Sequence, residues 1–309
     1  MEQEIRNAIL RTLAFFDAMD YAPTWTECVS YLEWQSSQGF VQCAVPSFDH
    51  LIAVRDQLIR EGIIDLAFGR IALKERIEEL VFASFTRSAF LARKMLKAQR
   101  IAKWLARFSS VRFVSVVNTT AFGHAKHEAD LDFFVITRHG SIWNTRLFAV
   151  SPYRFLGKLA NRDAKPDAVC LSYFISDQNL SLDSHVLKGD DPYFRYWFLG
   201  MLPLYDDGIG EELWKANASI RSLHPFAEPW RISPDWQVDS SKIRISVPSN
   251  MEPLARRIQM AWFPSRITDR MNRDNTVIVT DQALKFHVDD GRESYRDAYR
   301  ERLKTLGIE

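Results

Sequence analysis

The 309-residue chain lacks an excess of either charge, because 40 Lys and Arg residues against 39 Asp and Glu residues leave a formal net charge of +1. This balance argues against a basic nucleic-acid-binding surface over the whole protein, although it allows a local basic face. Cysteine is scarce, and Cys28, Cys43 and Cys170 show neither metal-ligand spacing nor an even set for disulfides. The sequence shows no signal peptide and no apolar run of transmembrane length. We therefore expect a reduced, cytoplasmic protein with no membrane association.

Internal repeats and low-complexity tracts are also missing, which excludes solenoid and linker-like architectures. What the chain does have is aromatic content: 13% of its residues are Phe, Trp or Tyr, including nine Trp. At this length, such a composition predicts a sizeable core spread over two or three domains.

Residues 1–75 have the pattern of a small separate module. Apolar residues recur at helical spacing in 4–19, and Thr24 and Ser47 are suited to cap a second and a third helix. Two short strand-like runs follow in 63–73, separated by a glycine. Three helices and a hairpin predict a winged helix. Its third helix mixes acids with bases, so binding of nucleic acid is possible but not favoured over a protein-contact or packing role.

Residues 76–110 are expected to form a helical connector of one or two long helices. Basic residues alternate there with an apolar stripe that includes Leu91, Met95 and Leu105. A phosphate-facing helix is one interpretation, and an amphipathic helix with a solvated charged face is the favoured one.

Asp130-Leu131-Asp132 is the most informative motif. The apolar run that follows, Phe133 to Ile136, predicts a buried strand, and carboxylates one residue apart on a strand point to the same face. Two adjacent like charges are costly unless a cation neutralises them, and Mg²⁺ or Mn²⁺ is the usual cation for such a pair with substrate phosphates. The alternative is a solvated strand end that carries two Asp residues by chance.

The flanking sequence favours the metal interpretation. A predicted strand ends at Val117, a polar turn follows at Asn118-Thr119-Thr120, and Gly123 and a polar loop precede the Asp pair. This arrangement, over residues 111–137, resembles the DNA polymerase beta-like nucleotidyltransferase superfamily. The resemblance implies that Asp130 and Asp132 bind metal and are catalytic, and that Asn118, Thr119, Thr120 and Gly123 form a nucleotide-binding turn.

Two departures from the family pattern leave an alternative open. Asn118-Thr119 stands where the family has Gly-Ser, although Asn tolerates left-handed backbone and Thr retains a hydroxyl. The family usually has a third carboxylate on a later strand, but the predicted strand 168–175 contains no acid and places Ser172 inward. Asp167 and Asp177 bracket that strand as candidates, and the absence of any third acid is the favoured single outcome.

After this core, helices are expected over 142–159, 254–263 and 295–306, with a strand-like run at 276–280. Arg146 and Arg154 are possible phosphate partners. Lys285 and His287 form a weak Lys-x-His pattern that is more typical of a surface pair.

These observations predict an α+β protein with four parts: a winged-helix-like module at 1–75, a helical connector at 76–110, a small mixed-sheet nucleotidyltransferase-like core at 111–180, and a mainly helical region at 181–309. The implied function is Mg²⁺-dependent transfer of a nucleoside monophosphate from a nucleoside triphosphate to an unknown acceptor. The alternative is a catalytically degenerate fold that serves as a binding or regulatory module.

Overall fold

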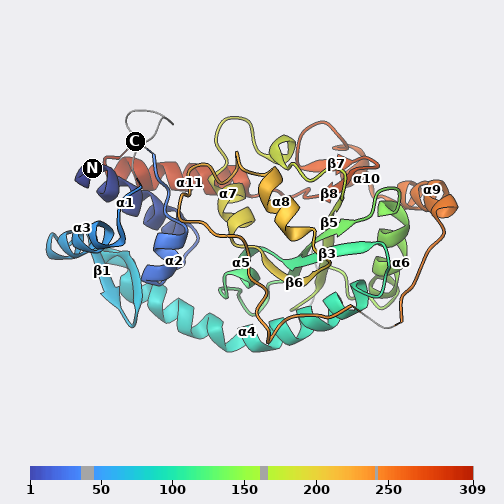
Figure 1. Cartoon of the computed structure of the whole chain (residues 1–309), viewed down its shortest axis with the longest axis horizontal. Coiled ribbons are helices and arrows are strands. Elements are labelled where there is room, and N and C mark those ends of the chain that lie inside the picture. Colours follow the sequence, from blue (N-terminus) through green and yellow to red (C-terminus); the bar gives the residue numbers. More distant parts are fainter. Residues whose placement is uncertain (36–44, 161–165, 241–242, 309) are drawn as a thin grey trace.

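The structure is a computed structural model that describes residues 1–35, 45–160, 166–240 and 243–308 (Figure 1). The fold is α+β, as the sequence predicts. Cys28 and Cys170 are free thiols, whereas Cys43 lies outside the described residues. Within the described ranges, no helix has the length and apolar character needed to cross a membrane.

Residues 1–75 contain the predicted three helices followed by a hairpin. The elements are α1 (Glu2–Ala18), α2 (Trp25–Ser30), α3 (Phe48–Arg60), β1 (Ile64–Ala67) and β2 (Arg70–Leu73). Thr24 and Glu27 form a reciprocal capping box at α2, and the Ser47 side chain accepts a hydrogen bond from the His50 amide at α3. The predicted hairpin is antiparallel and turns at Gly69, whose φ of +74° favours glycine.

A single long helix, α4 (Ile77–Leu105), forms the connector and runs along one side of the molecule (Figure 1). Its stripe of Met95, Ala98, Ile101 and Leu105 packs into the largest hydrophobic cluster, against one face of the central sheet. Burial of this stripe makes the helix part of the core, in agreement with the amphipathic interpretation.

The central sheet has six strands in the order β6-β3-β4-β5-β8-β7. Its members are β3 (Val111–Val116), β4 (Leu131–Thr137), β5 (Val169–Ser176), β6 (Leu202–Asp206), β7 (Val277–Val279) and β8 (Ala283–Phe286). Among the strand pairs that the structure describes, β4–β5 is parallel and the other pairs are antiparallel. The sheet is therefore mixed, and both of its central strands are buried on two faces.

Helices cover both faces of this sheet. One side packs against α4, α6 (Ile142–Phe155) and α9 (Glu252–Trp262) through residues such as Val114, Phe133 and Val135. The other packs against α7 (Pro192–Leu199) and α8 (Gly210–Ala216) through Phe134 and Tyr173. Successive side chains of β4 alternate between the two clusters, as in Phe133, Phe134 and Val135. This alternation follows from the two-residue period of a strand.

The region 181–309 contributes more to the sheet than its predominantly helical pattern suggests. It contains α7, α8, α9, α10 (Ser265–Thr268) and α11 (Arg292–Thr305), but it also supplies β6, β7 and β8. These strands are only three to five residues long, and β6 contains Pro203, so their own sequences carry a weak strand signal. Their conformation depends on pairing within the sheet: β6 pairs with β3, β8 with β5, and β7 with β8.

Helix α11 brings the chain back to the N-terminal module. It lies beside α1 (Figure 1), where Tyr299 packs edge-on against Phe15 and Arg302 donates a hydrogen bond to Asp17 at 2.8 Å. The remaining described elements are α5 (Asn118–Ala121) and three short 3-10 turns at 74–76, 183–185 and 249–251.

Candidate functional site

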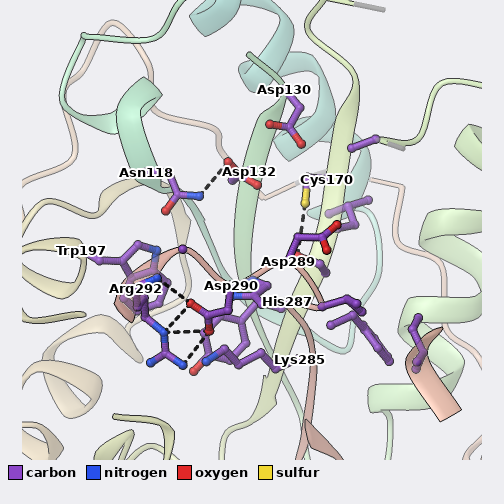
Figure 2. Close-up of a pocket in the computed structure, with 18 of the residues that line it drawn as sticks. Asn118, Asp130, Asp132, Cys170, Trp197, Lys285, His287, Asp289, Asp290 and Arg292 are labelled. Atoms are coloured by element: carbon purple, nitrogen blue, oxygen red, sulfur yellow. Dashed lines mark hydrogen bonds and ion pairs between the residues drawn. The ribbon is translucent and has the colours of Figure 1, made fainter. Parts of the chain in front are cut away.

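Asp130 and Asp132 lie at the start of β4 and line one cavity of about 530 Å³. Leu131, between them, is completely buried in the core, so the strand alternation places both carboxylates on the other side (Figure 2). The shared face predicted from the Asp-x-Asp spacing is therefore present.

Cys170 completes a compact group with the two acids. It pairs with Asp132 in the parallel register of β4 and β5, and one ligand atom from each of the three residues lies within 4.8 Å of the others. The Cys170 thiol is 3.2 Å from the Ser172 hydroxyl, and both residues line the cavity. Sequence reasoning identified Ser172 as inward but missed Cys170, because only the strand register places it beside the Asp pair.

The two carboxylates resist ionisation together. Burial, with the charge of Asp132 as the next cause, raises the pKa of Asp130 to about 6. Burial also raises the pKa of Asp132, opposed by hydrogen bonds from Asn118 and Cys170. The pKa of the Cys170 thiol is raised well above its ordinary value, by burial and then by Asp132. The site thus contains two acids that repel each other beside a protonated thiol.

Asn118 is the turn residue that reaches this group. Its backbone has a φ of +59°, in the left-handed region where a glycine is otherwise favoured. Its side-chain Nδ2 donates a hydrogen bond to Asp132 Oδ2 at 2.7 Å, and its side-chain Oδ1 accepts one from the Tyr193 hydroxyl at 3.1 Å. Asn118 therefore meets the backbone requirement of the turn and also orients one of the acids.

The other three residues of the expected nucleotide-binding turn lie elsewhere. Thr120 is buried, Thr119 is partly buried, and Gly123, with a φ of +67°, sits beside Leu91 of α4. In the described part of the chain none of these three residues lines the cavity that contains the Asp pair. The structure thus brings together Asn118, Asp130 and Asp132 but not Thr119, Thr120 or Gly123.

Both candidates for a third carboxylate are held in other ion pairs. Asp167 contacts the fully buried Lys94 at 2.8 Å and Arg93 at 2.9 Å, which lowers its pKa despite burial. Asp177, at the far end of β5, pairs with Arg112 at 3.3 Å. Neither lines the cavity in the described residues.

The opposite wall of the cavity comes from β8 and the loop that follows it (Figure 2). Lys285 is buried and donates a hydrogen bond to the Asn275 carbonyl at 2.8 Å; burial, and then the charge of Arg292, lower its pKa to about 7. His287 is neutral, because burial lowers its pKa to about 3. The Lys-x-His pattern is thus part of the cavity wall rather than an exposed surface pair.

Sequence reasoning also missed the segment that follows. Asp289, Asp290 and Arg292 line the cavity, and both oxygens of Asp290 accept hydrogen bonds from the Arg292 Nε at 2.9 Å. These residues lie about 160 positions after Asp130, where the loop after β8 leads into the first residue of α11, and they belong to no recognisable motif. The pairing of β8 with β5 brings them to the site.

Comparisons with protein-family models, curated proteins and solved structures find no match to this chain. The site is therefore interpreted from its own geometry and chemistry.

Proposed function

We propose that the protein is a Mg²⁺-dependent nucleotidyltransferase that moves a nucleoside monophosphate from a nucleoside triphosphate to an acceptor. The observation that carries this proposal is the placement of Asp130 and Asp132, side by side at the start of a central strand and within a cavity large enough for a nucleotide. The resemblance of residues 111–137 to the DNA polymerase beta-like superfamily supports the same chemistry.

The donor set fits a hard divalent cation. Mg²⁺ and Mn²⁺ prefer carboxylate oxygens and complete their coordination with water and substrate phosphates. Asp130 and Asp132 provide such oxygens, and their raised pKa values reflect a repulsion that a bound cation would relieve. Cys170 is the nearby soft donor, but a protonated thiol is a poor ligand for either ion. We therefore assign cation binding to the two acids.

A bound cation would neutralise charge on the phosphates and on the leaving pyrophosphate. The protein's own groups prepare the site for this step. Asn118, held by Tyr193, fixes one oxygen of Asp132, so that the acid is oriented before any ligand arrives. Trp197 and Phe194 are buried beside the same cavity and stack on each other, so they form part of its apolar wall.

A second candidate function is a non-catalytic nucleotide-binding module. Two observations favour it: the strand β5 places Cys170, and no acid, beside Asp132, and Thr119 lies outside the cavity. Because no acid on β5 lines the cavity in the described residues, activation of an acceptor hydroxyl requires a base from another element, and Asp289 and Asp290 are the other acids in the described lining. Binding without transfer is the expected behaviour of this candidate.

Calorimetric titration with the four nucleoside triphosphates, in Mg²⁺ and in EDTA, tests the first requirement of the proposal. Metal-dependent binding by the wild type and its loss in Asp130→Asn/Asp132→Asn are expected. The charge-matched control is Asp235→Asn/Asp239→Asn, which removes two exposed carboxylates. Thr119→Val should leave the affinity unchanged, because Thr119 does not line the cavity. Absence of binding by the wild type in both Mg²⁺ and Mn²⁺ would refute the proposal.

The two candidate functions separate at the next step. A small-molecule cell extract is added as the source of acceptors. If pyrophosphate is then released from the bound triphosphate, the result supports the transferase. Binding without release supports the non-catalytic module. If the wild type fails to bind a nucleoside triphosphate but the Asn118→Gly/Thr119→Ser variant binds one, the site has lost its ability to bind nucleotide through changes in the turn.

A further inference from the structure

A second cavity, of about 410 Å³, adjoins the one that contains the Asp pair. It lies between α6 and the segment from α9 to α10, at the end of the molecule far from the winged-helix module (Figure 1). The two cavities share Arg146 and Arg266, together with the apolar residues Val150, Leu159 and Ile267. A ligand in one cavity can therefore extend into the other.

Arginine gives this cavity its chemical character. Arg146, Arg154 and Arg266 line it, and none of the described residues that line it is acidic. Within the described ranges, no carboxylate oxygen lies within 4.0 Å of these three guanidinium groups. Elsewhere in the protein arginines commonly have such partners: Arg112, Arg195 and Arg292 each contact two acids.

Aromatic rings and an amide hold two of the guanidinium groups in place. Arg146 lies 4.4 Å from the ring centroid of Phe286 and donates a hydrogen bond to Gln259 Oε1 at 2.6 Å. Arg154 lies 5.4 Å from the ring centroid of Trp262. Stacking of this kind fixes a guanidinium plane while leaving N–H donors available.

The inner part of the cavity has unmet hydrogen-bonding capacity. Arg146 Nε is inaccessible to solvent and has no hydrogen-bond partner in the described part of the chain. Burial, and then the charge of Arg154, lower the pKa of Arg146 to about 10. A buried charge without a counterion is unfavourable, and a multiply charged anion in the cavity would offset it.

We propose that this arginine-lined cavity binds a phosphate group of the substrate whose reacting centre lies at Asp130 and Asp132. The assignment rests on the proposed function for its link to that centre. Arginine forks match phosphate oxygens in geometry, and three guanidinium groups around one cavity suit a ligand with more than one negative charge. The phosphate belongs either to the tail of the triphosphate or to a phosphorylated acceptor.

The test uses the full chain with inorganic tripolyphosphate as the probe, in EDTA, followed by calorimetry. Arg154 and Arg266 are exposed, so Arg154→Gln/Arg266→Gln removes two charges at little risk to folding. The matched control, Arg60→Gln/Arg300→Gln, removes two exposed charges elsewhere. We expect the test variant to bind tripolyphosphate about ten- to a hundredfold more weakly than the wild type, and the control to bind as the wild type does.

Equal binding by the test variant and the control, or no binding of tripolyphosphate by the wild type, would overturn the proposal. Binding that persists in Asp130→Asn/Asp132→Asn would support the phosphate site even where metal-dependent nucleotide binding fails, so the two proposals fail separately. Competition between tripolyphosphate and the Mg²⁺-bound nucleotide assigns the site to the triphosphate tail. Simultaneous binding of both assigns it to a phosphorylated acceptor.

Discussion

Asp130→Asn should stabilise the metal-free protein near neutral pH, although it removes a residue proposed to be functional. In the unfolded chain this carboxyl ionises near its ordinary pKa of 3.8, whereas in the folded protein burial and Asp132 raise the pKa to about 6. Between these values the folded state binds more protons than the unfolded state. Stability is therefore fully present below the unfolded pKa and falls as the pH rises through the folded pKa.

The size of this effect follows from the shift. A rise from 3.8 to about 6 corresponds to at most about 3 kcal/mol of destabilisation above the folded pKa. Asp130 is partly accessible to water in the cavity, and solvent screening reduces the expected value to about 1–2 kcal/mol. Replacement by the uncharged, nearly isosteric Asn should recover this amount near neutral pH and almost nothing in acid.

Urea unfolding of the wild type and Asp130→Asn in EDTA, at about pH 4 and about pH 7.5, measures the difference directly. Asp235→Asn is the control for removing an exposed acid. Added Mg²⁺ should then stabilise the wild type, because a cation that binds only the folded state raises its stability, and should have little effect on the variant.

The result that would refute this reasoning is an Asp130→Asn variant equal to or less stable than the wild type at about pH 7.5, or one whose advantage does not shrink in acid. Either outcome would mean that the Asp pair is not electrostatically strained in the folded protein.

Three further predictions concern the supports of the site and the fold. Asn118→Ala should destabilise the protein by about 2–3 kcal/mol, because it places Ala in a left-handed conformation and removes the hydrogen bond to Asp132. Asn118→Gly should be less destabilising; urea unfolding of both variants measures the difference, and the opposite order would contradict this reasoning. Asp167→Asn should lower the free energy of unfolding by about 3 kcal/mol or more, because it leaves the buried Lys94 without its main counterion. Adding Lys94→Met to that variant should restore part of the lost stability, and a purely additive double-mutant cycle would contradict the pairing. Thr24→Ala should cost about 1 kcal/mol through loss of the capping box, measured by thermal unfolding, and an unchanged melting temperature would speak against that cap.

Local sequence determined several elements of the fold because the controlling interactions are short in range. Thr24 and Ser47 cap the helices they were expected to begin, and Gly69 turns the hairpin, since each acts on backbone groups within a few residues. The helix α4 and the strand β4 follow from apolar periodicity in the same way.

In the candidate site, too, some features follow from local sequence and others depend on packing. That Asp130 and Asp132 share a face follows from the two-residue period of a strand, and that Asn118 can occupy a left-handed turn follows from its side chain. That Thr119 lies outside the cavity does not follow from its adjacency to Asn118, because the direction of its side chain depends on how the short helix α5 packs.

The sequence by itself determined that two acids would meet on one strand face, because a spacing of two residues fixes the directions of neighbouring side chains. Tertiary structure alone decided what faces them. The parallel register of β4 and β5 placed Cys170 beside Asp132, and the pairing of β8 with β5 brought Lys285 to the opposite wall. Packing of α6 against α9 placed Arg146 beside Gln259, more than a hundred residues away in the chain. Contacts between distant segments depend on sheet order and packing, which no local pattern of residues encodes.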